Sequence, residues 1–326
     1  MKTARHLNRW LVGAAAALSL ALAIPASAQS SYPNKPITFV VPFGTGTTDR
    51  LARFAGEQVS KEAGQPVIVD SKAGADGIIG ILHTLKQPAD GYTMVVGTIT
   101  THAANTSLHK ELPYDPMKDF VPVAGLAEGG LVLVVRPDFE ANSIQELIAL
   151  AKKNPDKYSF GSPNSTGRFG GERFQQLAGV NLLHVPYKSA AAALTDLIGG
   201  QTDMVFADMP AGMPLVQAGR LKALAVSTKE RVPALKDIPT FAEQGLPDYS
   251  YIGWVAVFAK QGTPKDVVNR MNKWIVDAME TPAAKELLHP LGWSSMKGTP
   301  EELLEVQARD TKIWADLVES AGIERR

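Results

Sequence analysis

Short apolar runs alternate along this chain with longer stretches in which apolar residues recur at helical spacing. The apolar runs are mostly continuous rather than interrupted by polar residues, which is typical of strands buried on both faces. They predict strands at 37–43, 66–70, 92–97, 131–137, 158–162, 204–208, 221–227 and 254–259. Because strands and helices alternate, we expect an α/β protein with largely parallel sheets.

Four of the intervening segments carry the signals of a helix start or end. Apolar residues recur at helical spacing through 51–63, and a glycine follows. The segment 143–154 opens with a serine and has a glutamate three residues later, which predicts a capping box. The segments 263–280 and 299–322 both open with Thr-Pro, which favours an N-cap followed by the first helical residue.

The first 28 residues have the features of an export signal. Three basic residues precede an apolar stretch that is short for a membrane span, and Ala26 and Ala28 form the small–x–small pattern of a cleavage site. The alternative is an uncleaved anchor helix. We expect cleavage, which leaves a mature chain beginning at Gln29, and we expect that chain in the periplasm.

Composition narrows the class of protein further. The 33 basic and 33 acidic residues balance and no basic block occurs, so the charge gives no case for a nucleic-acid partner. The absence of cysteine excludes a lipid-modified cysteine anchor, disulfides and thiol chemistry. A length of 326 residues, of which 45% are hydrophobic, is enough for two domains.

A small uncharged loop follows the first predicted strand and precedes a predicted helix. Ligands of α/β sheets bind at such turns, where a helix N-terminus has unpaired N–H donors and the positive end of the helix dipole. Gly44 and Gly46 can take a positive φ and let the backbone curl around a small anion. Thr45, Thr47 and Thr48 add hydroxyl donors. We therefore expect a neutral cradle for a carboxylate or a phosphate.

The chain lacks the motifs of the common cofactor and catalytic sites. The first loop has no third glycine of a dinucleotide fingerprint, and Asp49 would repel a pyrophosphate, so we expect its carboxylate to stabilise the first helical turn instead. No G-x-S-x-G, H-E-x-x-H or His/Cys cluster occurs. We therefore expect a binding protein that is not an enzyme and needs no metal or cofactor.

A second loop repeats the plan of the first. The stretch 158–179 reads as strand, polar loop and helix, as 37–59 does about 120 residues earlier, and Ser162, Ser165 and Thr166 supply hydroxyls. Chance similarity of two βα units is one explanation. The other is a pair of equivalent turns, one in each domain, that face each other across a cleft.

Two further turns offer polar groups after a strand. The first, 185–189, contains Tyr187 and leads into an alanine run, whose alternative reading is a helix packed tightly on a sheet. The second, 97–108, offers hydroxyls, and we expect His102 there to be a hydrogen-bonding loop residue rather than a catalytic base.

Three long stretches carry a resemblance to a known family. They read "YPNKPITFVVPFGTGTTDRLARFAGEQVSKEAGQPVIVDSKAGADGIIG", "HVPYKSAAAALTDLIGGQTDMVFADMP" and "AGRLKALAVSTKERVPALKDIPTFAEQG". In this order they resemble the Bug family, the periplasmic solute receptors of tripartite tricarboxylate transporters. The similarity covers essentially the whole expected mature chain.

The resemblance implies a two-domain periplasmic-binding-protein fold with two interdomain crossovers and a ligand cleft between the domains. We expect one domain from 29–130 together with 253–326, and the other from 131–252. The resemblance also implies closure around a small carboxylate and delivery to the large and small membrane subunits of a transporter. For such a shuttle we expect a monomer.

The resemblance also implies which residues bind the ligand. In the family, one ligand carboxylate is held between the first βα loop and the facing loop of the other domain, partly through ordered water. The residues expected at the ligand are Phe43, Gly44, Thr45, Gly46, Thr47, Thr48, Asp49, Thr101, Ser162, Asn164, Ser165, Thr166, Arg168, Phe169, Tyr187, Ser189 and Asp208.

This chain departs from the family at three of these places. Threonines replace glycines in the first loop, Ser189 replaces a glycine, and Arg168 stands where a histidine falls. Arg168 can clamp a second carboxylate in bidentate fashion, or it can pair with Glu172, four residues on. The clamp predicts a dicarboxylate, and an aromatic one would find walls in Phe43, Phe169, Tyr187 and Trp254.

Asp208 does not fit a dianion, because an unpaired carboxylate would repel it. We expect it to bind a ligand amine or hydroxyl, or to pair with Arg168 when no ligand is bound. Two other functions stay open: an exported enzyme that acts on a small carboxylate, and a ligand-sensing partner of a membrane signalling protein.

Overall fold

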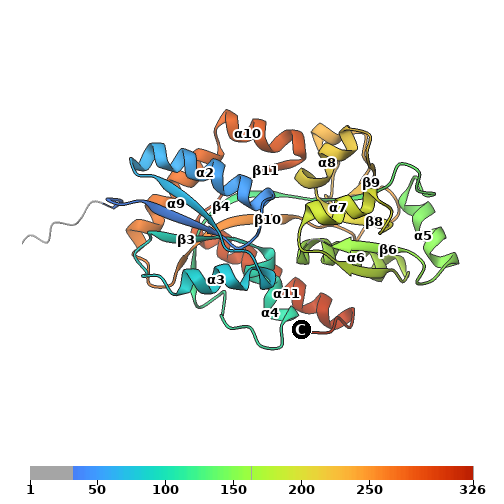
Figure 1. Ribbon diagram of the computed structural model, residues 1–326, viewed down its shortest axis with the longest axis horizontal. Coiled ribbons are helices and arrows are strands. Elements are labelled where there is room, and N and C mark those ends of the chain that lie inside the picture. The colour runs from blue at the N-terminus through green and yellow to red at the C-terminus, as the bar shows by residue number, and fades with distance from the viewer. Residues whose placement is uncertain (1–31, 163, 326) are drawn as a thin grey trace, which may run out of the picture. The chain divides into compact units, whose positions relative to one another are not determined.

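Two β-sheets organise the chain in the computed structural model, which describes residues 32–162 and 164–325 (Figure 1). All helices and strands belong to one unit, Lys35–Arg326. The predicted signal peptide, 1–28, lies outside the described residues.

The first sheet has six strands in the order β11-β4-β10-β3-β1-β2. Figure 1 shows α2 and α10 on one side of these strands and α3 and α11 on the other. The strands are β1 (Ile37–Val41), β2 (Val67–Ser71), β3 (Thr93–Thr98), β4 (Phe120–Gly129), β10 (Gly253–Lys260) and β11 (Trp293–Ser295). The helices of this part are α2 (Thr47–Ala63), η1 (Ala75–Gly77), α3 (Ile78–Leu85), η2 (Thr100–Ala104), α4 (Asn105–Leu108), α9 (Lys265–Met279), α10 (Pro282–Leu288), η4 (His289–Leu291) and α11 (Pro300–Ser320).

The second sheet has five strands in the order β7-β6-β8-β5-β9. Its strands are β5 (Leu131–Val135), β6 (Ser159–Ser162), β7 (Leu183–Pro186), β8 (Met204–Asp208) and β9 (Lys222–Val226). Its helices are α5 (Ile144–Lys153), α6 (Ser165–Ala178), α7 (Ala190–Ile198), α8 (Met209–Gln217) and η3 (Pro233–Leu235).

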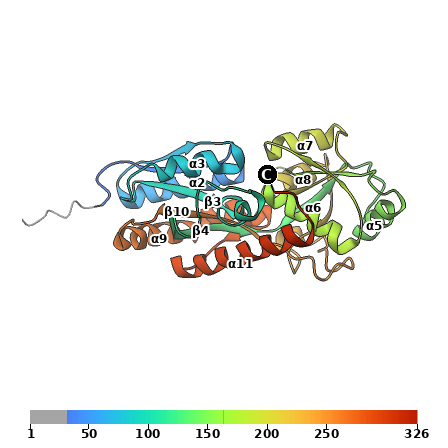
Figure 2. The same ribbon diagram turned by 90° about the horizontal axis from the view of Figure 1, so that it is seen from below.

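The chain passes between the sheets twice, and this confirms the predicted α/β fold with two crossovers. It leaves the first sheet at the end of β4, enters β5 after the single residue Gly130, and returns between β9 and β10. The C-terminal helix α11 also reaches the second part: Gln176 Nε2 on α6 donates to Ser320 Oγ at 3.1 Å (Figure 2). The expected domain limits stay a prediction.

The prediction of largely parallel sheets was wrong. β1 pairs in parallel with β2 and β3, and β6 with β7 and β8, as βα units require. However, β10 runs antiparallel to both its neighbours, β11 runs antiparallel to β4, and β5 runs antiparallel to β8 and β9. β5 and β10 enter their sheets directly from a crossover rather than after a βα crossover helix, so the parallel rule does not apply to them.

Strand β4 was missed because its sequence reads as a loop. It contains Pro122 next to a register shift in the pairing with β10, where a missing N–H is tolerated. It also contains Gly125 and Gly129, because side chains from the β11 region pack directly on its backbone: a Cβ on Gly125 would lie 2.6 Å from Met296 Cγ. The strand is nevertheless almost wholly buried.

The helix starts follow the predicted signals unequally. Thr299 and Glu302 form a full capping box at α11. At α5, Ser143 accepts from the Glu146 N–H, but the glutamate side chain accepts from the Asn142 N–H instead of closing the box. α9 begins one residue later than expected, because the Thr263 hydroxyl donates to the Lys260 carbonyl.

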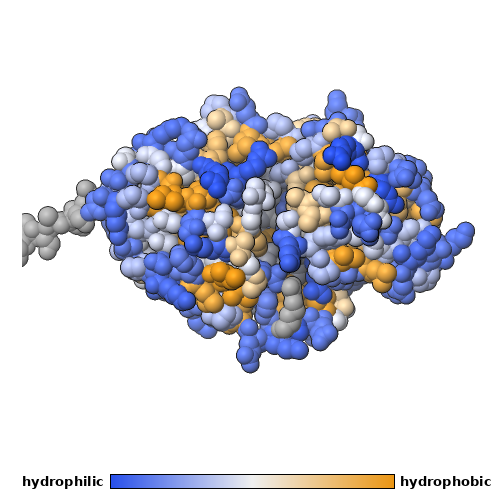
Figure 3. Space-filling view, viewed as in Figure 1, coloured by the Kyte–Doolittle hydropathy of each residue, from blue (hydrophilic) through white to orange (hydrophobic). Residues whose placement is uncertain are grey.

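The surface offers no continuous apolar face in the view of Figure 3, where hydrophobic residues form patches separated by hydrophilic ones. Among the helices of the described residues, none is both long and apolar enough to cross a bilayer.

Candidate functional site

Loops from both sheets line one cavity, here called the first cavity, with a volume of about 810 Å³ including its mouth. The first loop, Phe43–Thr48, forms one wall. Asn164, Thr166 and Asp208 come from the second sheet's loops and helix starts. The remaining lining residues are Thr98, Thr100, Lys188, Ser189, Ala190, Ala211, Gly253, Trp254, Val255 and Trp293. The cavity therefore brings together ten of the expected ligand residues.

The first loop presents an uncapped helix N-terminus to this cavity. α2 begins at Thr47, and no side chain caps it at Gly46. A Cβ on Gly44 would meet nothing within 4 Å, so open space rather than packing surrounds that glycine. Neither glycine lies in the left-handed region that was expected, and Gly46 is extended at φ 170. The free N–H groups of the first turn, with the threonine hydroxyls, suit a bound anion.

Asp49 lies behind this wall rather than in the cavity. Its side chain is 9% exposed and accepts two hydrogen bonds from Arg53, at 2.9 Å from Nε and 3.0 Å from Nη2. The Ser71 hydroxyl approaches it at 3.4 Å. These contacts hold the first turn of α2, which is the structural role expected for this acid.

Asp208 faces the first cavity beside Asn164. Asn164 caps α6 by accepting from the Gly167 N–H at 2.8 Å, and its Nδ2 donates to Asp208 Oδ2 at 3.4 Å. Burial raises the pKa of the Asp208 carboxyl to about 6, and the bond from Asn164 opposes this rise only in part. Asp208 can therefore change its charge close to physiological pH.

A second cavity, of about 590 Å³, shares Asn164 with the first. Arg168, Tyr187 and His184 line it, and Ser162 Oγ lies 2.6 Å from His184 Nε2. The hydroxyl of Ser165 is buried there without a hydrogen-bond partner in the described part of the chain. Asp76, Pro186 and Ser162 complete the lining.

Arg168 forms an ion pair with Glu172, which lies four residues later on α6. Its Nε lies 3.4 Å from Glu172 Oε1, and the two side chains are 17% and 15% exposed. The hydrogen bond found at Asp208 comes from Asn164 rather than from Arg168. Arg168 and Asp208 line different cavities.

Three expected ligand residues lie outside both cavities: Asp49, described above, Thr101 and Phe169. Thr101 is fully buried, accepts from the Thr98 N–H at 3.1 Å and contacts the ring of His102 at 2.9 Å. His102 stacks on Phe258 with ring centroids 3.8 Å apart, and burial lowers its pKa to about 3, so it stays neutral as a packed residue.

Phe169 is the third of these residues. It is 4% exposed, and its ring packs against Tyr251 at 4.4 Å and Trp314 at 5.3 Å. This aromatic cluster joins α6 to the returning crossover and to α11. An aromatic residue beside a binding loop looks like a ligand wall in a sequence, although here it packs in the core.

Sequence reasoning missed several lining residues. Thr98 and Lys188 adjoin expected positions, and their loops were singled out, so hydroxyl and cation content could have found them. Trp254 was not among them, because it was expected as a wall and lines the first cavity. Trp293 gave no signal, because it lies on a three-residue strand far along the chain from every βα turn. No group of three or more His, Cys, Asp or Glu side chains that could hold a metal occurs within residues 32–162 and 164–325.

Comparisons with known proteins agree on one family. The model of the "Tripartite tricarboxylate transporter family receptor" matches residues 51–323. The structure of R. palustris Rpa4515 with adipate is 33% identical, with a TM-score of 0.87 over 90% of this chain and 100% of that one. MatC (Rpa3494) from Rhodopseudomonas palustris with bound malate is 29% identical, with a TM-score of 0.82 over 88% and 100%. Periplasmic binding protein BugD is 32% identical, with a TM-score of 0.83 over 90% and 100%. These likenesses confirm the two-domain periplasmic-binding-protein fold.

Proposed function

The chain belongs to the tripartite tricarboxylate transporter receptor family, and from this premise we propose that it captures a small dicarboxylate between its two domains and delivers it to the membrane subunits of such a transporter. We place the mature protein in the periplasm as a monomer. The proposed domains are 29–130 with 253–326, and 131–252, so that closure brings together the loops that line the two cavities.

The observation that carries this proposal is the uncapped start of α2 in the first cavity. Its N–H groups and the hydroxyls of Thr47 and Thr48 offer neutral donors to a carboxylate. The facing loop contributes Asn164 and Thr166. A ligand that contacts both sides favours the closed arrangement, because those contacts exist together only there.

The second carboxylate would bind to Arg168 in the second cavity. The contact of this guanidinium with Glu172 is long and involves Nε, so its terminal nitrogens can form the paired bonds that a carboxylate accepts. Adipate in the R. palustris relative and malate in MatC are both dicarboxylates, which supports the class. Phe43 and Trp254 in the first cavity and Tyr187 in the second would allow an aromatic dicarboxylate as well.

Asp208 then faces the part of the ligand between its charged ends. With a pKa raised to about 6, its carboxyl can be protonated and donate to the ligand rather than repel it. Ser189 and the exposed Lys188 lie on the same side of the cavity. With these assignments, the site selects a ligand by the distance between its two carboxylates and by its charge, and it does not require one particular carbon skeleton.

Calorimetry with charged and neutral versions of one ligand tests the proposal. Adipate and malate are titrated into the purified protein beside their dimethyl esters, which keep the carbon chain and remove both charges. We expect binding of at least one dicarboxylate and none of its ester. Equal binding of acid and ester would contradict recognition by anion cradles. Chemical turnover of a bound acid would instead favour an enzyme.

A further inference from the structure

The side chain of Trp293 lines two separate cavities. It lines the first cavity, and it also lines an open groove of about 1200 Å³, here called the outer groove. The groove runs over 228–234, Ser250, Ile252, His289 and 292–294. The side chain is nearly buried, with Trp293 5% exposed, although it lines both the first cavity and the outer groove.

Packing rather than hydrogen bonding fixes the indole in this place. Trp293 lies opposite Gly129 in the pairing of β11 with β4, and a Cβ on Gly129 would lie 2.2 Å from the ring atom Cδ1. Gly292 has a φ of 77, and a Cβ there would lie 2.5 Å from Met209 Sδ. The indole N–H is buried without a partner in the described residues. The ring is therefore held in place by its packing.

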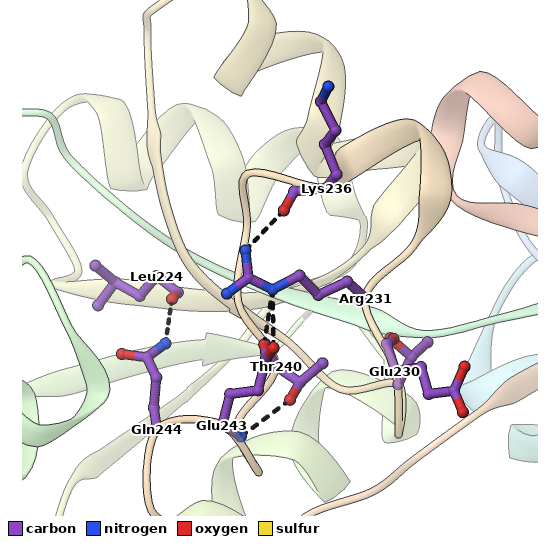
Figure 4. Close-up of polar contacts among 8 residues, drawn as sticks. Leu224, Glu230, Arg231, Lys236, Thr240, Glu243 and Gln244 are labelled. Atoms are coloured by element: carbon purple, nitrogen blue, oxygen red, sulfur yellow. Dashed lines mark hydrogen bonds and ion pairs between the residues drawn. The ribbon is translucent and has the colours of Figure 1, made fainter.

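Hydrogen bonds and an ion pair hold the loop that carries Arg231 and lines the groove. Figure 4 shows Arg231, whose Nε lies 2.9 Å from both carboxylate oxygens of Glu243 and whose Nη1 donates to the Lys236 carbonyl at 2.7 Å. Glu243 also accepts from the Thr240 N–H at 2.8 Å. These bonds tie the loop that forms the groove to the segment after it, so the groove exists before any ligand enters.

The groove is suited to an aliphatic chain. Val232, Pro233 and Ile252 line it, and Ile252 is 44% exposed, which leaves apolar surface for a ligand to cover. Trp293 is the residue that this groove shares with the lining of the first cavity.

We infer that Trp293 sets the longest ligand that the first cavity accepts, and that removing its ring joins the cavity to the outer groove. This inference rests on the proposed function, because it needs a carboxylate anchored at the start of α2. With the ring present, a chain that passes the indole has no room. With the ring absent, the same chain continues into apolar surroundings.

Three variants and one ligand series test this inference by calorimetry. The series runs from hexanoate through octanoate to decanoate, because an acid with a single carboxylate anchors at the start of α2 and leaves its chain free to reach Trp293; adipate is included as the dicarboxylate of the proposed function. Trp293→Ala should lose the length limit and gain about fourfold in affinity for each added methylene that enters the groove. Trp293→Phe keeps an aromatic ring without the N–H and should keep the limit. Ser294→Ala changes a residue that lines the groove but not the cavity, and should bind as the wild type does.

The outcomes separate the two hypotheses. If the wild type binds the short acids and Trp293→Ala has the same length limit as the wild type, the inference is wrong, whereas the proposed function stands. If no protein binds any member, the proposed function fails and the inference fails with it. Should Trp293→Ala not fold, as thermal unfolding would show, Trp293→Leu restores part of the volume and must shift the limit in the same direction.

Discussion

Replacing Arg168 with alanine should weaken a dicarboxylate far more than a monocarboxylate of the same chain length. The Arg168 side chain is 17% exposed, and that of its ion-pair partner Glu172 is 15% exposed, so both act in a partly desolvated site. Hydrogen bonds to a charged group contribute about 1.5–3 kcal/mol, and loss of the clamp should therefore reduce affinity by about 10- to 150-fold.

Adipate and hexanoate form the matched pair, because both have six carbons and only one has a second carboxylate. Isothermal calorimetry on the wild type and on Arg168→Ala gives the ratio of the two losses. We expect the large loss for adipate and a loss of less than about threefold for hexanoate, which has no group for the clamp.

Two controls come from the same helix. Arg173→Ala removes an arginine that bonds Gln176 and lines neither ligand cavity, so it should leave both affinities unchanged. Glu172→Gln removes the competing carboxylate and should tighten adipate binding. Equal losses for adipate and hexanoate in Arg168→Ala would refute the clamp, and the arginine would then serve only its pair with Glu172.

Three further predictions concern the cradle, its pH dependence and the packing behind it. Thr48→Val removes one hydroxyl from the first cavity and should cost about 1–3 kcal/mol of binding free energy in calorimetry, whereas unchanged affinity would exclude a direct bond. Because Asp208 has a folded-state pKa raised from 3.8 to about 6, its ionisation destabilises the fold and opposes an anionic ligand as pH rises. The melting temperature and the affinity for a dicarboxylate should thus both be higher at pH 5.5 than at 7.5, and Asp208→Asn should flatten both changes; an unaltered pH profile in the variant would assign them to other groups. Gly129→Ala places a Cβ 2.2 Å from the Trp293 ring and should lower the free energy of unfolding by about 1–3 kcal/mol in denaturant titrations, and a variant as stable as the wild type would show that the ring moves freely.

Local patterns predicted most of the elements, and the reasons for the exceptions are physical. Continuous apolar runs located β1, β3, β5, β8 and β10 within two residues of their ends. The pattern failed for β4, where glycines stand against Met296 and Trp293 instead of the usual strand residues. Strand direction failed as well, because antiparallel entry from a crossover depends on the path of the whole chain.

The sequence predicted those parts of the candidate site in which backbone N–H groups are the expected ligand contacts. The loops at 43–48 and 164–166 could be found because glycine and hydroxyl residues between strand and helix have few other uses. The same loop pattern does not show whether a given side chain points into the cavity or into the core. Phe169 points to Trp314, and only the packing of α6 decides this. Trp293 reaches the first cavity from a strand whose neighbours are set by tertiary contacts.

A thermal-unfolding screen of the purified mature protein tests the central claim most directly. The panel holds C4–C6 dicarboxylates, citrate, aromatic mono- and dicarboxylates, nicotinate and acidic amino acids. A ligand at one hundred times its dissociation constant adds about 2.7 kcal/mol of stability, which raises the melting temperature by several degrees. We predict such a rise for dicarboxylates and a smaller one or none for monocarboxylates. A panel in which no carboxylate raises the melting temperature would contradict a carboxylate receptor.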